Sequence, residues 1–310
     1  MVKVVFMGTP NFSVPVLESL IENENYDVVG VVSQPDKKVG RKQLLTPSPI
    51  SEVAILNNIP LLRIENIKND FQCVLELNPD IIITCAYGQI IPQELLEFPK
   101  YGCINVHASL LPKFRGGAPI QRAIITGEEK TGITIMYMDK KMDSGDIIVQ
   151  EELDILDSDN LETLTNRLSI LGRDLLLKTL PSIINNTNSR FSQDSSKVTY
   201  AYNITHDEEH IDFNKSCRNV FNQVRGLSPN PGCYVCFHEK VIKVYNGYET
   251  KDVATGNVGM ITKIYKDGIG VNTQNYIYVI TEIKLEGKKK MKAKDYLNGC
   301  KDKLIGEYYE

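Results

Sequence analysis

Only four histidines occur in the 310 residues, and His107 lies in a segment suited to chemistry. It ends the apolar run CINVH and is followed by the turn ASLLPKFRGG. Asn105 lies two residues earlier, so in a strand both side chains leave from the same face. An amide beside an imidazole can hold a carbonyl group and stabilise the oxyanion that develops from it.

A carboxylate follows in the segment MDSGDII, where Asp143 lies in a predicted loop between two strands. An acid beside His107 would orient the ring and favour its charged form. The residues RGG at 115–117 would let the backbone approach a ligand closely. Each residue alone has a simpler explanation: Asn105 as a turn residue, His107 as a buried imidazole, Asp143 as a loop acid. Their combination is what predicts a site.

Two other groupings contain ligands that metals use. His206 and His210 bracket HDEEH, but Asp207 stands where the zinc motif H-E-x-x-H requires Glu. We interpret that segment as the start of a solvated acidic helix. Cys233 and Cys236 form one C-x-x-C, whereas a zinc site needs about four ligands and a second close pair is missing. A strand would also turn the two cysteines to opposite faces. We expect no metal.

The elements that must position these residues alternate between strand and helix in the first part of the chain. Apolar runs predict buried strands over residues 2–8, 27–34, 80–87, 103–107, 131–138 and 146–155, with a short strand from residue 60. Helical spacing covers residues 14–22, 50–57, 71–77 and 160–180. This alternation predicts a parallel sheet covered on both faces, with ligands beyond the carboxyl ends of its strands. Residues 35–49, with three prolines, are predicted to form a polar loop.

The pattern changes near residue 185, where a polar stretch rich in Ser and Asn predicts a linker. After a helix at about 215–225, short strands with Gly-Asn and Asp-Gly turns predict a small barrel or sandwich. Another helix begins near Ala293. The predicted boundaries are 1–189 for an α/β domain, 190–207 for the linker and 208–310 for the β-rich domain.

Charge and composition limit the classes of function. The net charge of −4 argues against a general nucleic-acid binder. Residues 1–207 carry a net −7 and residues 208–310 a net +3, which fits a local polyanion-binding surface or ordinary scatter of surface charge. Seven scattered cysteines are unlike a disulfide scaffold, and no segment resembles a signal peptide or a membrane span. We therefore expect a cytoplasmic protein.

Together, these motifs resemble one known family. The pattern N-x-H-x-S-L-L-P-x-x-R-G-x-x-P-I at 105–120, followed by D-x-G-D at 143–146, resembles the 10-formyltetrahydrofolate-dependent formyltransferases. Further segments match that family at 6–17, 31–41, 46–50, 86–92, 102–124, 131–148 and 287–299. Within the family, the resemblance is closest to the members that act on methionyl-tRNA.

The resemblance implies a Rossmann-like α/β formyltransferase domain and a C-terminal OB-like β-barrel domain. It implies transfer of the formyl group of 10-formyltetrahydrofolate to the free amino group of methionyl-initiator-tRNA, giving N-formylmethionyl-tRNA for translation initiation. The catalytic residues it assigns are Asn105, His107 and Asp143. The folate-binding residues it assigns are Ser109, Leu110, Leu111 and Pro112, with Gln89, Ile90 and Ile91 lining the pterin pocket.

Two basic segments are assigned to tRNA. In the family, the loop at 35–49 reaches the acceptor end of the tRNA, and it carries Lys37, Lys38, Arg41 and Lys42 here. The second segment carries Lys288, Lys289 and Lys290, which suit phosphate contacts without reading bases. A solvated loop and a solvated hairpin are the simpler explanations. We expect a monomer with no membrane partner.

The residues leave three other functions to consider. A sister formyltransferase acting on an amino sugar nucleotide or on glycinamide ribonucleotide would share the same three residues, and the basic segments favour tRNA over these acceptors. A dehydrogenase is disfavoured because GTPNF, after the first strand, lacks G-x-G-x-x-G. A non-enzymatic nucleic-acid-binding barrel would not need the intact set of Asn105, His107 and Asp143.

Overall fold

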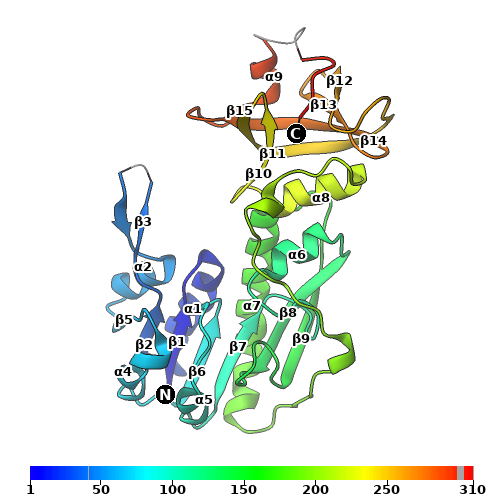
Figure 1. Cartoon of the computed structure of the whole chain (residues 1–310). Coiled ribbons are helices and arrows are strands. Elements are labelled where there is room, and N and C mark those ends of the chain that lie inside the picture. Colours follow the sequence, from blue (N-terminus) through cyan, green and yellow to red (C-terminus); the bar gives the residue numbers. More distant parts are fainter. Residues whose placement is uncertain (41, 299–303, 310) are drawn as a thin grey trace. The chain divides into compact units, whose positions relative to one another are not determined.

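The computed structural model describes residues 1–40, 42–298 and 304–309. The chain divides into two compact units, each built from separate stretches of sequence (Figure 1). The first unit comprises residues 1–119, 130–154 and 165–202, and the second comprises residues 120–129, 155–164 and 203–310. In the described part of the chain, no helix is long and apolar enough to span a membrane.

A seven-stranded sheet in the order β5-β2-β1-β6-β7-β8-β9 forms the centre of the first unit (Figure 1). Its strands are β1 (Val2–Gly8), β2 (Tyr26–Ser33), β5 (Leu61–Arg63), β6 (Ile81–Cys85), β7 (Cys103–His107), β8 (Lys130–Tyr137) and β9 (Ile147–Asp154). The five strands from β5 to β7 are parallel, as predicted. The prediction is wrong for β8 and β9, which run antiparallel to their neighbours. The loop 138–146 joins β8 directly to β9, and such a short connection can only join antiparallel strands.

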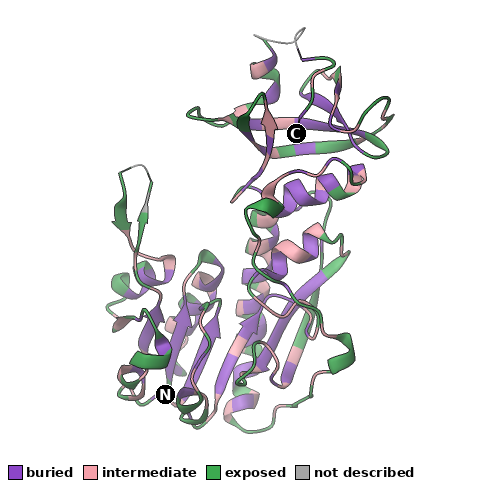
Figure 2. Cartoon of the chain, in the orientation of Figure 1, coloured by how far each residue is buried: buried purple, intermediate pink, exposed green. Residues whose placement is uncertain are grey.

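Helices accompany this sheet, and four of them lie where helical spacing predicted: α1 (Val14–Ile21), α2 (Pro49–Leu56), α4 (Gln72–Leu75) and α7 (Leu161–Ile184). The short helices α3 (Ile67–Asp70) and α5 (Gln93–Glu97) were not predicted, nor was α6 (Pro119–Ile125), most of which belongs to the second unit. Every residue of β6 is buried, as expected for a strand covered on both faces (Figure 2). A side-chain carbon at Gly172 of α7 would lie 3.0 Å from Val106 of β7, so this helix packs closely against the strand that ends at His107.

The segment 35–49 is not a plain loop, so that prediction is wrong. It contains the two-stranded antiparallel hairpin β3 (Lys37–Val39) and β4 (Leu44–Thr46). The three prolines of the segment lie outside the paired residues and leave the ladder intact. Gly40 turns the chain between the strands with a φ of 71°, which a residue with a side chain adopts less easily.

The polar stretch after α7 is held against the first unit by main-chain hydrogen bonds. We call residues 187–202 the strap. Phe191 and Ile147 exchange two such bonds of 2.8 and 2.9 Å. Further along, the amide of Ala201 donates to the carbonyl of Arg115 at 2.7 Å. The polar composition of the strap predicts that it has no hydrophobic core of its own. Composition does not reveal hydrogen bonds that use only backbone groups.

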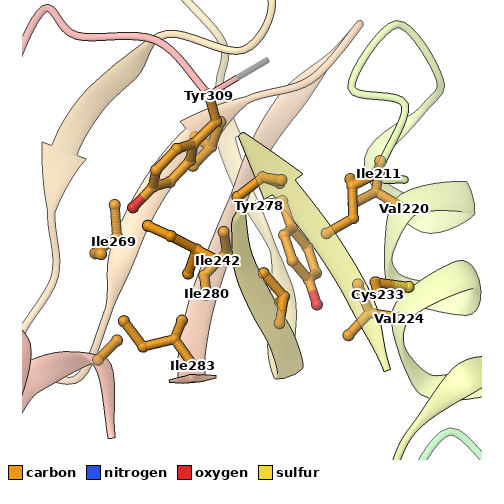
Figure 3. Close-up of a cluster of buried hydrophobic side chains, with 14 of the residues drawn as sticks. Ile211, Val220, Val224, Cys233, Ile242, Ile269, Tyr278, Ile280, Ile283 and Tyr309 are labelled. Carbon is orange, nitrogen blue, oxygen red and sulfur yellow. The ribbon is translucent and has the colours of Figure 1, made fainter. Parts of the chain in front are cut away.

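The second unit is built on a six-stranded antiparallel sheet in the order β10-β11-β14-β13-β12, with β15 paired to β14. Its elements are β10 (Cys233–Phe237), β11 (Lys240–Val253), β12 (Ile261–Ile264), β13 (Ile269–Asn272), β14 (Tyr276–Leu285), β15 (Met291–Lys292), α8 (Cys217–Leu227) and α9 (Ala293–Leu297). Val220 and Val224 of α8 join Tyr278 and Ile280 of β14 in one buried cluster (Figure 3). The packing of α8 against this sheet therefore closes the core of the unit.

Candidate active site

Asn105 and His107 lie at the carboxyl end of β7, the edge at which parallel sheets bind ligands. The Thr84 hydroxyl on the neighbouring strand β6 donates to Asn105 Oδ1 at 2.9 Å. The amino group of Asn105 therefore points away from Thr84, and its Nδ2 lies 3.5 Å from Asp143 Oδ1. The structure thus brings the amide and the acid together, and it fixes which end of the amide is a donor.

His107 is 6% exposed and has one ring nitrogen already engaged. Its Nε2 lies 3.1 Å from the carbonyl oxygen of Phe114. A carbonyl can only accept, so Nε2 carries a proton and donates. Nδ1 lies 3.7 Å from Asp143 Oδ1, which is too long for a hydrogen bond. Nδ1 is therefore the nitrogen that can bind a ligand. It accepts a hydrogen bond when the ring is neutral and donates one when the ring is charged.

Asp143 lies in the loop between β8 and β9, with an unusual φ of 51°. Its Oδ2 accepts a hydrogen bond of 2.8 Å from the amide of Gly116. Gln193 of the strap donates to the carbonyls of Asp143 and Gly145 at 2.9 and 2.8 Å. Two segments remote in sequence thus fix the acid. Sequence reasoning missed Gln193, because nothing in its polar surroundings distinguishes it.

The turn after His107 is partly engaged within the protein. Ser109 is fully buried, and its hydroxyl donates to the carbonyl of Lys113 at 2.7 Å. Leu111 is buried as well, whereas Leu110 and Pro112 are half-buried. Of the four residues assigned to folate in this turn, Leu110 and Pro112 thus keep side-chain surface for a ligand, while Ser109 and Leu111 shape the turn.

A pocket of about 80 Å³ lies beside Asn105 and Asp143. Its wall includes Asn105 and Asp143 together with Gln89, Ile90 and Ile91 from the sequence prediction. The structure adds side chains that the sequence analysis did not single out: Met136, Met138, Asp139, Lys141 and Met142. The methionines could have been suspected from their closeness to the D-x-G-D motif. Apolar walls with a few polar groups are typical of small-molecule sites.

Gln89 has a different role from Ile90 and Ile91 in the wall of the pocket. Its Oε1 accepts from the amide of Ile67 at 2.9 Å, and its Nε2 donates to the carbonyl of Ile64 at 3.2 Å. These bonds hold the segment before α3 against the pocket. Ile91 is buried, and Ile90 is half exposed. A larger cavity of about 310 Å³ lies between β9 and α7, and its lining includes neither Asn105, His107 nor Asp143.

The basic residues assigned to tRNA lie on the surface of both units. Lys37, Lys38 and Lys42 are exposed on the β3–β4 hairpin, and Arg41 lies outside the described residues. Lys288 and Lys289 are exposed in the turn between β14 and β15. Lys290 of the same turn is exposed and pairs with Glu282 at 3.0 Å.

The HDEEH and C-x-x-C groupings both belong to the second unit. Among the described residues, no group of three or more His, Cys, Asp or Glu side chains could hold a metal ion. Asp207–Glu209 forms a short 3₁₀ turn, and the Arg122 guanidinium holds the Glu208 carboxylate through bonds of 2.5 and 3.1 Å. This pairing lowers the pKa of Glu208 to about 2. Of the C-x-x-C pair, Cys233 is buried and Cys236 partly exposed, as opposite faces of a strand require.

Comparison with known proteins shows to which family the chain belongs. The formyl transferase family matches residues 2–180, and the formyl transferase C-terminal domain matches residues 203–301. The chain belongs to the formyl transferase family. The Rossmann-like catalytic fold predicted from the sequence is thereby confirmed, and the C-terminal part is an antiparallel sheet domain.

The same comparison identifies relatives within the formyl transferase family. The chain is 47% identical over 310 residues to methionyl-tRNA formyltransferase of Staphylococcus epidermidis, with 99% of each chain covered. It is 17% identical to the structure of methionyl-tRNA formyltransferase from Clostridium thermocellum, with a TM-score of 0.59 over 89% of this chain and 100% of that one. An N-formyltransferase from Helicobacter canadensis, in complex with folinic acid and dTDP-3-aminofucose, is 21% identical, with a TM-score of 0.66 over 94% and 100%. Both structures share the fold.

Proposed function

We propose that this formyl transferase moves the formyl group of 10-formyltetrahydrofolate to the amino group of methionyl-initiator-tRNA. The observation that carries the proposal is the 47% identity to a methionyl-tRNA formyltransferase along 99% of both chains. The N-formyltransferase from Helicobacter canadensis, whose structure contains dTDP-3-aminofucose, is only 21% identical to this chain. We infer a cytoplasmic monomer, with a catalytic domain at 1–189, a linker at 190–207 and a tRNA-binding domain at 208–310. The family matches at 2–180 and 203–301 support this division.

The pocket beside Asn105 suits the pterin end of the co-substrate. Its 80 Å³ has room for about five to eight waters at about 10–15 Å³ each, which is comparable with one bicyclic ring system. Ile90, Ile91 and the methionines offer apolar faces to a flat ring, and Asp139 and Asp143 offer acceptors to its polar edge. When bound there, the co-substrate would supply the formyl group next to the Asn105 amide.

The residues at the end of β7 can then serve acyl transfer. Asn105 donates from Nδ2 to the oxygen of the formyl group as negative charge develops on it. His107 accepts through Nδ1 the proton that the attacking amine must lose, and it returns that proton to the folate nitrogen that leaves. Asp143, 3.7 Å from Nδ1, stabilises the charged ring between these two steps. One C–N bond forms, one breaks, and one proton moves between the two nitrogens.

A formylation assay tests the proposal directly. Purified protein would receive 10-formyltetrahydrofolate and initiator tRNA charged with methionine, with charged elongator tRNA and free methionine as controls. We expect acid-stable formylmethionine only on the charged initiator. An amino sugar nucleotide or glycinamide ribonucleotide could instead accept the formyl group while charged tRNA does not. That result would refute tRNA as the acceptor and still support formyl transfer as the reaction.

The salt dependence of tRNA affinity tests the basic hairpin. Each phosphate contact contributes about −0.7 to −0.9 to the slope of log affinity against log salt. Replacement of Lys37, Lys38 and Lys42 by Ala should therefore flatten the slope by about two to three. Lys68→Ala, at an exposed lysine of the first unit, is the matched control and should leave the slope unchanged. An unaltered slope in the triple variant would show that the hairpin does not contact phosphates.

A further inference from the structure

Two tyrosines of the strap form a stacked pair on the surface of the first unit. The ring centroids of Tyr200 and Tyr202 are 5.6 Å apart, and the ring planes differ by 14°. Their exposed fractions are 52% and 65%. Single exposed aromatic residues are common, but two parallel rings that are each more than half exposed offer a flat apolar face to another planar group.

Backbone pairing fixes this pair in place. Ala201, between the tyrosines, is fully buried. Its amide donates to the carbonyl of Arg115 at 2.7 Å, and its carbonyl accepts from the amide of Ala118 at 3.0 Å. Alternate residues of an extended chain point to opposite sides, so the burial of Ala201 turns both tyrosines outward. The pair is therefore held by the protein before any ligand arrives.

The segment that holds the tyrosines also holds the acid of the site. A side-chain carbon at Gly116 would lie 2.7 Å from the carbonyl oxygen of Ala201, so the two backbones are in close contact. The amide of the same Gly116 donates to the Asp143 carboxylate at 2.8 Å. Gly116 thus contacts both the backbone of Ala201, between the tyrosines, and the Asp143 carboxylate that faces His107.

We propose that Tyr200 and Tyr202 form a stacking platform for the unpaired nucleotides that carry the aminoacyl ester of the acceptor. This inference rests on the proposed function. The amine to be formylated is joined through an ester to the last ribose of a single-stranded end, so unpaired bases must lie close to the catalytic residues. Every base has a π-face, and exposed aromatic rings bind such faces without reading sequence. Two exposed lysines lie on the neighbouring segments: Lys113 follows Pro112, and Lys197 of the strap pairs with Asp194 at 3.5 Å. Their positive charge suits the phosphates between the bases.

Kinetics with matched variants test the platform. Stacking of one base is worth about a 5- to 150-fold change in affinity, so the double variant Tyr200→Ala/Tyr202→Ala should raise KM for charged tRNA by about that factor. Its KM for 10-formyltetrahydrofolate should stay within about twofold. The double variant to Phe keeps the rings and should match the wild type. Phe191→Ala, which removes a 59% exposed ring elsewhere on the strap, is the control and should change neither KM.

A spectroscopic measurement separates stacking from a merely structural role. A charged tRNA with 2-aminopurine in its unpaired 3′ end should lose fluorescence on binding to the wild type and to the Phe variant, but not to the Ala variant. Equal quenching by the Ala variant, or an unchanged KM for charged tRNA, would overturn the platform and leave formylation of tRNA intact. A wild type that formylates no charged tRNA would overturn both the platform and the proposed function.

Discussion

Replacement of Gly116 by Ala should disturb the acid of the site without removing any polar group. The added carbon would lie 2.7 Å from the carbonyl oxygen and 3.1 Å from the carbonyl carbon of Ala201. Both neighbours are backbone atoms, so neither can turn aside as a side chain would. The φ of Gly116 is 128°, which a residue with a side chain rarely adopts. Either the strap or the segment after His107 must therefore shift.

The size of the effect follows from two contributions. Backbone strain of this kind costs about 1–3 kcal/mol. A shift that breaks the 2.8 Å bond from the Gly116 amide to the Asp143 carboxylate costs about 1.5–3 kcal/mol more. We therefore expect the free energy of unfolding to fall by about 2.5–6 kcal/mol. We also expect kcat to fall by up to about 100-fold, because a catalytic group displaced by about 1 Å loses about that factor.

Urea unfolding and single-turnover formylation would measure the two effects. Gly102→Ala is the matched control in the same unit: its φ is 77°, and the nearest atom to the added carbon, in Tyr137, is 3.4 Å away. It should cost only about 1 kcal/mol of stability, from the positive φ, and leave kcat unchanged. If Gly116→Ala unfolds like Gly102→Ala and keeps kcat within about twofold, the close contact does not position Asp143.

Three further predictions concern the polar residues of both units. Asn105→Ala and Asp143→Asn should each lower kcat by about 10²–10³-fold while circular dichroism stays unchanged, and near-normal turnover would remove that residue from the mechanism. Thr84→Val removes the bond that orients Asn105 and should lower kcat about five- to tenfold with KM for folate unchanged, as steady-state rates would show. Arg122 lowers the pKa of Glu208 from its ordinary 4.5 to about 2, so this carboxylate contributes stability above pH 4.5 that is lost as pH falls towards 2. Glu208→Gln should flatten thermal stability across that window and cost at most about 1 kcal/mol at pH 7, because the pair is partly exposed.

The local pattern of the sequence determined much of the fold. Apolar runs located β1, β2, β6 and β7, and helical spacing located α1 and α7, because both signals depend on residues that are neighbours in the chain. The same pattern could not reveal strand direction, so β8 and β9 were wrongly placed in a parallel sheet. It also missed the β3–β4 hairpin, because strands of three residues are too short to show the alternation that marks a strand.

Residue types and a familiar motif likewise indicated Asn105, His107 and Asp143, while only the tertiary structure decided how these residues are held. The tautomer of His107 follows from the carbonyl of Phe114, which lies within reach only once the turn has folded. Asp143 is held by Gln193, 50 residues away in the chain. Such bonds join positions that have no fixed spacing in sequence. Packing of the sheet, the turn and the strap alone brings them together, so no local pattern encodes them.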